Sequence, residues 1–184
     1  MVSTAFHARV ALVAMPGGGK STVGRQLAQS LQVPFVDTDT LIEHQIGMPI
    51  KEWFALKGES SFRDIEQAEI THLNINQSMV LATGGGAILR EANRNFLRQN
   101  FTVIYLHSSP TALYRRLRYD KSRPLLQVTN PFQRLEELYR ERDSLYRQAS
   151  HFVLETGRPS VHTLVHKILM QLELNSSFEY PNNS

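Results

Sequence analysis

A glycine-rich stretch at residues 14–22 has the residue types and spacing of a phosphate-binding loop. An apolar run at 10–13 precedes it and a helical apolar pattern follows it, which is the strand–loop–helix context that such a loop requires. Glycine lets backbone N–H groups surround phosphate oxygens, and the positive end of the helix dipole favours the same anion. Lys20 can reach the outer phosphates of a nucleotide, and the Ser21 hydroxyl can ligate Mg²⁺. The candidate nucleotide-binding residues are Gly17, Gly18, Gly19, Lys20, Ser21 and Thr22.

Ala14 is a departure from the strict pattern, which begins with glycine. A methyl group is the smallest possible intrusion, so we expect a slightly adjusted turn and a working site. The competing interpretation is a glycine-rich turn that happens to be followed by Lys20 and Ser21. The flanking strand and helix patterns argue against that interpretation.

Two carboxylates, Asp37 and Asp39, follow a short apolar segment at 33–36 that we expect to be a strand. Ligands of open parallel sheets bind beyond the carboxyl ends of the strands, so both acids should reach the same rim as the phosphate loop. If the backbone stays extended, the two side chains diverge. One can then face the metal and phosphates while the other faces a second substrate. Either could instead cap a helix predicted at 41–45.

Arg63 and Glu66 lie in a region, 40–77, whose pattern is helical with breaks at 47–49 and 57–58. Two helical pieces, where a single crossover helix would suffice, indicate a substrate-binding lobe at about 38–77. The two charges are one turn apart and can pair on one face. They form either an ordinary surface ion pair or an arginine that Glu66 holds ready for an anion.

Three consecutive glycines, 84–86, follow a buried-strand pattern at 79–83. Successive glycines cost backbone entropy, so a plain turn rarely needs all three. At the end of a strand they permit close approach of the main chain to a ligand, although a simple linker has the same composition. The other predicted elements are a helix at 87–97, a strand at 101–106, a helix at 110–118, a helix at 132–149, a strand at 152–154 and a helix at 161–172.

The helix at 132–149 carries an arginine on its apolar stripe. Leu138 and Tyr146 belong to that stripe, and continuing it by helical spacing places Arg142 on the inward face. An inward charge needs a partner, and a substrate carboxylate would serve. The alternative is an internal ion pair with an acid of the core.

Residues 119–131 have no apolar periodicity, and a loop of this length inside a compact domain is usually functional, often as a lid. Arg123 precedes Pro124 and is therefore biased toward an extended conformation. Such an arginine could reach over nucleotide phosphates as the loop closes and expels water.

The composition is that of one ordinary globular domain, with 41% hydrophobic and 20% charged residues in 184. The absence of cysteine excludes a disulfide framework and a cysteine-ligated metal. No apolar run is long enough to cross a membrane and no signal peptide is evident, so we expect a cytoplasmic protein without a membrane partner. The net charge is +3, but the Lys and Arg residues are scattered among acidic residues and have few aromatic residues near them. This pattern argues against a nucleic-acid partner. The domain should end at 174, with a disordered tail at 175–184.

Taken together, these motifs make the sequence similar to the shikimate kinase family over about residues 10–172. The motifs that carry the resemblance are the phosphate loop with Gly-Lys-Ser-Thr at 19–22, Val-Asp-Thr-Asp at 36–39, Phe-Arg-Asp-Ile-Glu at 62–66, the triple glycine at 84–86, Arg-Pro-Leu-Leu at 123–126 and Arg-Asp-Ser-Leu-Tyr at 142–146.

The resemblance implies a three-layer α/β P-loop fold like that of nucleoside monophosphate kinases, with a five-stranded parallel sheet. It also implies ATP and Mg²⁺ as cofactors and the 3-hydroxyl of shikimate as phosphoryl acceptor, and we expect a monomer. The catalytic residues would be Lys20, Asp39 and Arg123, the last being the lid arginine. Ser21 and Asp37 would hold Mg²⁺. The acceptor site would comprise Asp39, Arg63, Gly84, Gly85, Gly86 and Arg142, in which the two arginines clamp the carboxylate.

Arg116 and Arg158 are weaker matches to the adenine contacts of the family. Pro159 stands near where relatives often place a nucleotide-contacting side chain, so that contact is either lost or supplied by Arg158.

Two other functions remain open from the residues alone. One is a gluconate-type small-molecule kinase on the same fold, and the other is a P-loop module that binds nucleotide without transferring phosphate.

Overall fold

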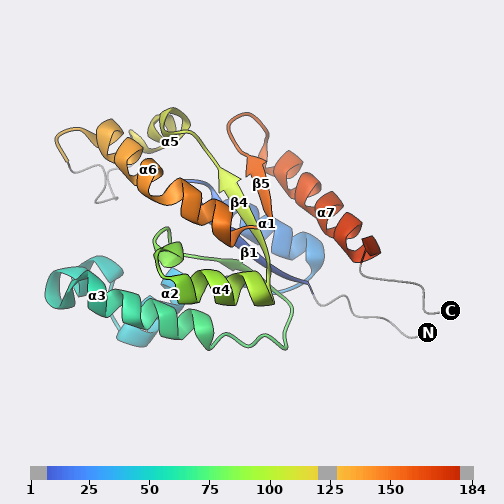
Figure 1. Cartoon of the computed structure of the whole chain (residues 1–184), viewed down its shortest axis with the longest axis horizontal. Coiled ribbons are helices and arrows are strands. Elements are labelled where there is room, and N and C mark those ends of the chain that lie inside the picture. The colour runs from blue at the N-terminus through green and yellow to red at the C-terminus, as the bar shows by residue number, and fades with distance from the viewer. Residues whose placement is uncertain (1–7, 120–127, 179–184) are drawn as a thin grey trace.

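The computed structural model describes residues 8–119 and 128–178, and within them a single sheet lies at the centre of the molecule (Figure 1). The sheet has five strands in the order β2-β3-β1-β4-β5, and every neighbouring pair is parallel. The carboxyl ends of all five strands therefore lie at one rim, where ligands of such sheets bind. The strands are β1 (Arg9–Val13), β2 (Phe35–Asp37), β3 (Met79–Ala82), β4 (Thr102–His107) and β5 (Phe152–Glu155).

The central strand β1 is apolar from Val10 to its end, and both of its faces are covered there. Val10 pairs with Val80 of β3 on one side and with Thr102 of β4 on the other. The four residues from Val10 to Val13 are fully buried. Such a run without polar alternation is typical of a parallel sheet buried on both faces.

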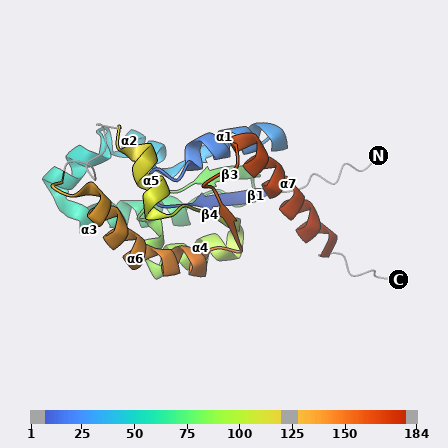
Figure 2. The same cartoon turned by 90° about the horizontal axis from the view of Figure 1, so that it is seen from above.

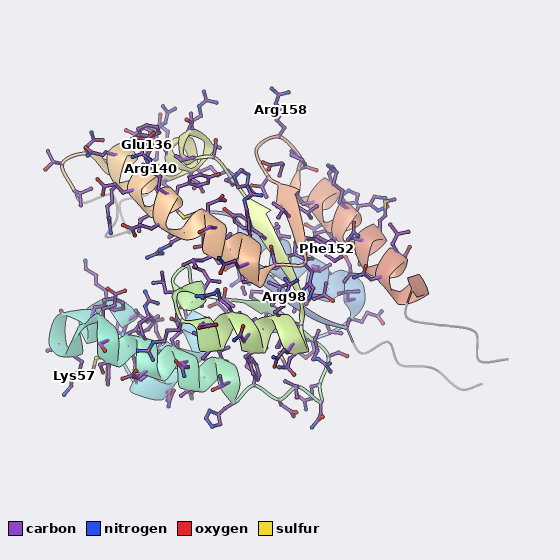
Figure 3. All side chains as sticks on the ribbon, viewed as in Figure 1. Lys57, Arg98, Glu136, Arg140, Phe152 and Arg158 are labelled. Carbon is purple, nitrogen blue, oxygen red and sulfur yellow. The ribbon has the colours of Figure 1, made fainter. Side chains whose placement is uncertain are left out.

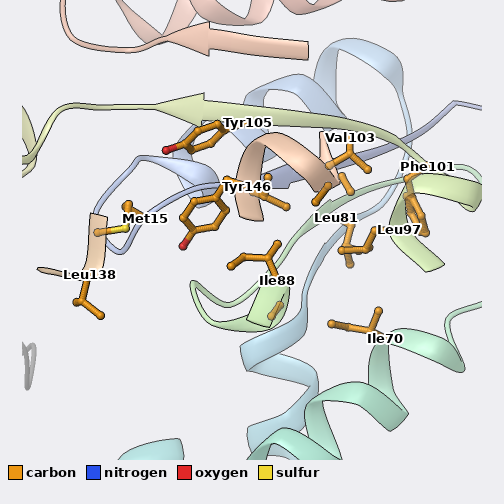
Figure 4. Packing of buried hydrophobic residues seen from close by; sticks show 14 of the residues in the cluster. Met15, Ile70, Leu81, Ile88, Leu97, Phe101, Val103, Tyr105, Leu138 and Tyr146 are labelled. Carbon is orange, nitrogen blue, oxygen red and sulfur yellow. The ribbon is translucent and has the colours of Figure 1, made fainter. Parts of the chain in front are cut away.

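Helices cover both faces of the sheet and complete the three predicted layers (Figure 2). On one face, α1 (Lys20–Leu31) and α7 (Val161–Phe178) pack together over a core that includes Leu27 and Ile168. The other face is covered by α4 (Glu91–Asn100) and α6 (Pro131–Ala149), whose buried side chains join a second core with Tyr105 and Tyr146 (Figure 4).

Three further helices lie beyond the strand ends and border the rim. Helices α2 (Thr38–Ile46) and α3 (Ile50–Thr71) connect β2 to β3 and pack on each other, so two helices lie where one crossover helix would suffice (Figure 1). Gly58, with φ 82° and ψ 171°, kinks α3 where the sequence predicts a break. Helix α5 (Pro110–Leu117) packs on α6.

Several boundaries differ from those predicted. Helix α2 begins at Thr38, earlier than predicted, because Asp37 caps it, and α3 ends at Thr71 instead of near 77. The predicted helix at 87–97 is wrong at its start, where Ala87–Leu89 form a 3₁₀ turn before α4. Its N–H groups bond back into the glycine loop, as Ala87 does to the Gly84 carbonyl at 3.1 Å. Helix α7 continues to Phe178, four residues past the predicted end of the domain, because extending a formed helix costs little.

Across residues 8–119 and 128–178, no helix has both the length and the apolar character needed to cross a bilayer.

Candidate active site

The phosphate loop joins β1 to α1 and has the geometry that the sequence predicts. Gly17 and Gly19 have φ of 79° and 88°, which side-chain-bearing residues rarely adopt. The N–H of Gly18 donates to the Met15 carbonyl at 2.9 Å, which closes the turn before α1 begins at Lys20. The Lys20 ammonium donates to the Ala14 carbonyl at 3.1 Å and thus folds back over the loop.

Ala14 fits the loop because the residue opposite it has no side chain. Ala14 is 1% exposed and belongs to the core beneath α1. A Cβ built on Gly18 would lie 2.6 Å from the Ala14 Cβ, closer than two carbons can approach. The methyl group at 14 is therefore accommodated by the glycine at 18, and the turn keeps its form.

Ser21 and Asp37 meet at the start of α1, where β2 ends. The Ser21 hydroxyl donates to Asp37 Oδ2 at 3.3 Å, while Asp37 Oδ1 accepts the Asp39 N–H at 2.9 Å and caps α2. The two interpretations of Asp37 therefore use different oxygens and are compatible. A hydroxyl and a carboxylate beside a phosphate loop fit Mg²⁺, which takes few protein ligands and completes its shell with phosphates and water.

A surface hollow of about 340 Å³ opens beside the loop, between the start of α1 and the β5–α7 turn. Gly17 to Gly19 line it together with Arg116, Thr156 and Pro159. Arg116 donates to the Thr156 carbonyl at 2.7 Å, so it ties α5 to that turn. The exposed Arg158 extends outward from the turn (Figure 3) and does not line the hollow. The hollow and the inward-turned glycine backbone fit a nucleotide.

Arg63 lies on α3 at the other side of the rim, and two glutamates hold its guanidinium. Nη1 donates to Glu66 Oε1 at 2.7 Å, and Nε and Nη2 donate to Glu59 Oε1 at 3.3 and 3.1 Å. The Arg63 side chain is 13% exposed, and its Cζ lies 5.2 Å from the centroid of the Phe62 ring. Arg63 is therefore preorganised and desolvated, unlike an ordinary surface ion pair.

The triple glycine brings these groups against the main chain at the end of β3. A Cβ on Gly84 would lie 2.7 Å from Asp39 Oδ1 and 3.0 Å from Glu66 Oε2. A Cβ on Gly86 would overlap the Arg63 guanidinium, at 2.5 Å from its Cζ. Side chains at these positions are sterically excluded, so this loop is not a simple linker.

Arg142 approaches the same loop from α6. Its Nε is buried and forms no hydrogen bond, and none of the described carboxylates forms an ion pair with it. One turn later on α6, the Tyr146 hydroxyl donates to the Gly85 carbonyl at 2.5 Å. The alternative of an internal ion pair with a core acid is therefore not seen among the described residues. Arg142 is half-buried, it interacts with Tyr146 and Glu66, and its Nε has no partner among the described residues. A half-buried guanidinium of this kind suits an incoming carboxylate.

Comparisons with known proteins agree with this geometry. The family model "Shikimate kinase" matches residues 16–173, which is most of the chain. The chain belongs to the shikimate kinase family. The shikimate kinase of Ralstonia nicotianae is 52% identical over 165 residues, covering 90% of this chain and 87% of that protein. The one from Paracidovorax citrulli is 51% identical over 167 residues, covering 89% and 91%.

Solved structures show the same relationship. A shikimate kinase from Acinetobacter baumannii, in complex with shikimate, has a TM-score of 0.86 at 41% identity and covers 94% of this chain and 98% of its own. A gluconokinase from Sinorhizobium meliloti has a TM-score of 0.53 at 16% identity, covering 96% and 99%, and that likeness shows only a shared fold.

Two acids at the rim of this shikimate kinase family member, the half-buried Asp39 and the buried Glu66, have shifted pKa values. Burial raises the pKa of Asp39, the neighbouring Asp37 raises it further, and Lys20 and Arg63 oppose the shift. Burial also raises the pKa of Glu66, against the attraction of Arg63. The two carboxylates therefore lie between cations and still resist ionisation, which is a pattern typical of functional sites.

Arg123, the predicted lid arginine, lies outside the described residues, as does most of the predicted lid at 119–131. Two contacts around the acceptor residues were not predicted from the sequence. Glu59 lies four residues before Arg63, and the helical spacing of opposite charges could have identified it. Tyr146 was predicted only as part of an apolar stripe, and no sequence signal reveals the partner of its hydroxyl.

Proposed function

We propose that the protein transfers the γ-phosphoryl group of ATP to the 3-hydroxyl of shikimate, giving ADP and shikimate 3-phosphate. The observation that carries this proposal is the position of Asp39. Its carboxylate touches the glycine loop at Gly84 and interacts electrostatically with Lys20 of the phosphate loop and with Arg63. Arg63, Arg142 and the glycine loop 84–86 together form the proposed acid site. A group bound by the arginines would therefore meet the phosphate donor at Asp39.

The arginines would bind and orient the acceptor. Arg63 of α3 packs against Gly86, and Arg142 of α6 interacts with Tyr146, which binds Gly85, and with Glu66. Each arginine can donate paired hydrogen bonds to a carboxylate. Holding the acid at one end directs its ring hydroxyls toward Asp39. Such alignment supplies much of the rate enhancement in phosphoryl transfer, where the protein performs little covalent chemistry.

Asp39 would orient the attacking hydroxyl and accept its proton. A raised carboxyl pKa makes a better proton acceptor at neutral pH, because the most effective base has a pKa near the working pH. Lys20 would neutralise charge on the transferring group. Ser21 and Asp37 would hold Mg²⁺, which supplies further charge neutralisation when bound.

The remaining roles are proposals from the resemblance. Arg123 would reach the phosphates from the lid. Arg116 would contact adenine from the wall of the hollow. Arg158 points outward (Figure 3), so Pro159, which lines the hollow, would lie nearer to the adenine than Arg158. Since one chain supplies all of these described groups, a monomer would be sufficient for activity.

A coupled assay of ADP release tests the proposal. We expect turnover with shikimate, with none for gluconate and none for a control without acceptor. Phosphorus NMR of the product should place the new phosphate on the 3-hydroxyl. Lys20→Ala should abolish turnover. Turnover with gluconate alone would replace the proposal with the gluconate-type kinase, and nucleotide binding without any transfer would indicate the non-catalytic module.

A further inference from the structure

Two buried tyrosines lie side by side beneath the acid site, and their hydroxyls have different partners. Tyr105 on β4 and Tyr146 on α6 are both 0% exposed, and their rings stack with centroids 4.9 Å apart (Figure 4). The Tyr105 hydroxyl donates to Asp143 Oδ1 at 2.9 Å, and Arg147 also holds Asp143 at 2.9 Å. The Tyr146 hydroxyl instead donates to the Gly85 main chain. Only one of the two therefore reaches the glycine loop.

The Tyr146 contact fixes the orientation of a peptide group in that loop. A carbonyl can only accept, so the phenol must be the donor and its lone pairs remain available to a cation. The Gly85–Gly86 peptide is planar and trans, so its N–H points opposite to its C=O. Anchoring the Gly85 carbonyl on Tyr146 therefore directs the Gly86 N–H away from the phenol. The same anchoring fixes the position of Gly86, which packs against the Arg63 guanidinium.

The same phenol lies next to Arg142. The two residues are one turn apart on α6 and share the face that meets the loop. The pKa of Tyr146 rises to about 12 because burial disfavours the phenolate, and the nearby Arg142 charge limits that rise. The phenol therefore stays neutral and keeps its proton for Gly85. Arg142 retains a buried donor, Nε, that has no partner within residues 8–119 and 128–178.

We propose that Tyr146 is a positioning residue for the acceptor, which holds the Gly85–Gly86 peptide and Arg142 at a fixed spacing before the acid binds. This inference rests on the proposed function and assigns to the Tyr146 hydroxyl a part in acceptor affinity. Tyr146 does not touch the reacting atoms. Loss of its hydroxyl should therefore weaken acceptor binding much more than it slows the chemical step.

Tyr146→Phe and Tyr105→Phe form a matched pair, because each keeps its buried ring and loses one buried hydrogen bond. We expect both variants to melt at similarly lowered temperatures. Calorimetric titration with shikimate should show that Tyr146→Phe raises Kd roughly tenfold, while Tyr105→Phe changes it by less than about twofold. In steady state, Tyr146→Phe should raise KM for shikimate by a similar factor and leave KM for ATP unchanged. Its kcat should fall less than its KM rises.

Equal changes in Kd for the two variants would indicate general loosening of α6 and overturn the inference, as would an unchanged Kd for Tyr146→Phe. If the wild-type protein itself fails to bind shikimate, the proposed function is wrong and the inference falls with it. A crystal structure of the wild type with shikimate is an independent test. It should keep the phenol oxygen within about 3.2 Å of the Gly85 oxygen, next to Arg142. A phenol turned away from both would overturn the inference even if Tyr146→Phe did not fold.

Discussion

Arg63 is held by two carboxylates that differ greatly in exposure. The Glu66 side chain is 1% exposed and binds Nη1, whereas the Glu59 side chain is 58% exposed and binds the Nε–Nη2 edge. That edge can form paired bonds with a carboxylate. An incoming acid would therefore displace Glu59, whose surface pair is weak, while Glu66 keeps the guanidinium in place.

Glu59→Gln should lower KM for shikimate by about two- to fivefold, because the substrate carboxylate no longer competes with a charged side chain for Arg63. Steady-state kinetics at low ionic strength would measure this change. Glu52→Gln, an equally exposed change on α3, is the control and should leave KM unchanged. A higher KM for Glu59→Gln would show that Glu59 helps to position Arg63 and does not compete for it.

Arg142→Ala should raise KM for shikimate roughly 10- to 100-fold and leave KM for ATP nearly unchanged, because it removes a desolvated, charge-assisted contact to the acid. Initial-rate measurements with each substrate varied in turn would show this. The control is Arg140→Ala, which removes an exposed arginine of α6 (Figure 3). If the two variants behave alike, Arg142 is not part of the carboxylate clamp.

At the scale of elements, close packing of α1 against β2 brings Ser21 near Asp37. Gly24, one turn after the phosphate loop, makes this approach possible. A Cβ built on it would lie 2.5 Å from Phe35 Cε2 and 3.4 Å from Leu12 Cδ1. A glycine inside a helix normally costs stability, so its presence here has a packing reason.

Gly24→Ala should therefore lower the melting temperature although alanine favours helices. Overpacking costs about 1–3 kcal/mol, which exceeds the gain of about 1 kcal/mol in helix propensity. Thermal unfolding followed by circular dichroism would measure the change. Ser30→Ala on the exposed side of α1 is the control and should stabilise slightly or not at all. An increase in melting temperature for Gly24→Ala would mean that Phe35 can move aside.

The elements were predictable where their signals are local. The apolar run of β1, the turn glycines and the pattern of α1 are all contained in residues 10–31, and the structure confirms them. The start of α4 was not predictable in this way, because Ala87–Leu89 continue the glycine loop through bonds to Gly84 and Gly86. Those bonds depend on how the loop packs against α3 and α6, and the sequence pattern does not contain that information.

The residues of the proposed acid site could be predicted one by one, but their arrangement could not. Arg63 and Arg142 each follow from the pattern of their own helix, yet their meeting at one loop depends on the complete fold. The partner of the Tyr146 hydroxyl is a main-chain oxygen, so no residue type marks it. The outward direction of Arg158 could not be predicted either. Arg158 lies in a turn, and a turn has no periodicity from which the direction of a side chain could be inferred.

At the scale of the whole molecule, the site carries a cost in stability. Burial raises the pKa of Asp39, so the folded state binds this proton more tightly than the unfolded chain does. Its contribution to stability is therefore largest below the unfolded pKa of 3.8 and is lost as pH rises through the higher pKa of the folded state. Above the pKa of the folded state, the ionised carboxylate lowers the stability of the fold. Functional sites often show this conflict.

Asp39→Asn should raise the melting temperature at pH 7 while it abolishes phosphoryl transfer. The gain should shrink as pH falls and vanish below about pH 3.8, where both side chains are neutral. Thermal unfolding across pH 3.5–8 would test this dependence. Asp64→Asn is the control, since the Asp64 side chain is 69% exposed and forms only a surface pair with Arg90. A destabilised Asp39→Asn at pH 7 would show that its attraction to Lys20 and Arg63 outweighs burial.

The strand order separates the two halves of the rim. The groups proposed to bind the acid lie around the glycine loop that follows β3, whereas the hollow proposed for the nucleotide lies toward β4 and β5, with β1 between them. An inhibitor that binds only at the glycine loop after β3 would contact arginine side chains and glycine backbone, and would not occupy the hollow proposed for the nucleotide. We expect such a compound to bind other P-loop enzymes weakly. Those enzymes share the nucleotide-binding side of the rim but not the proposed acid site.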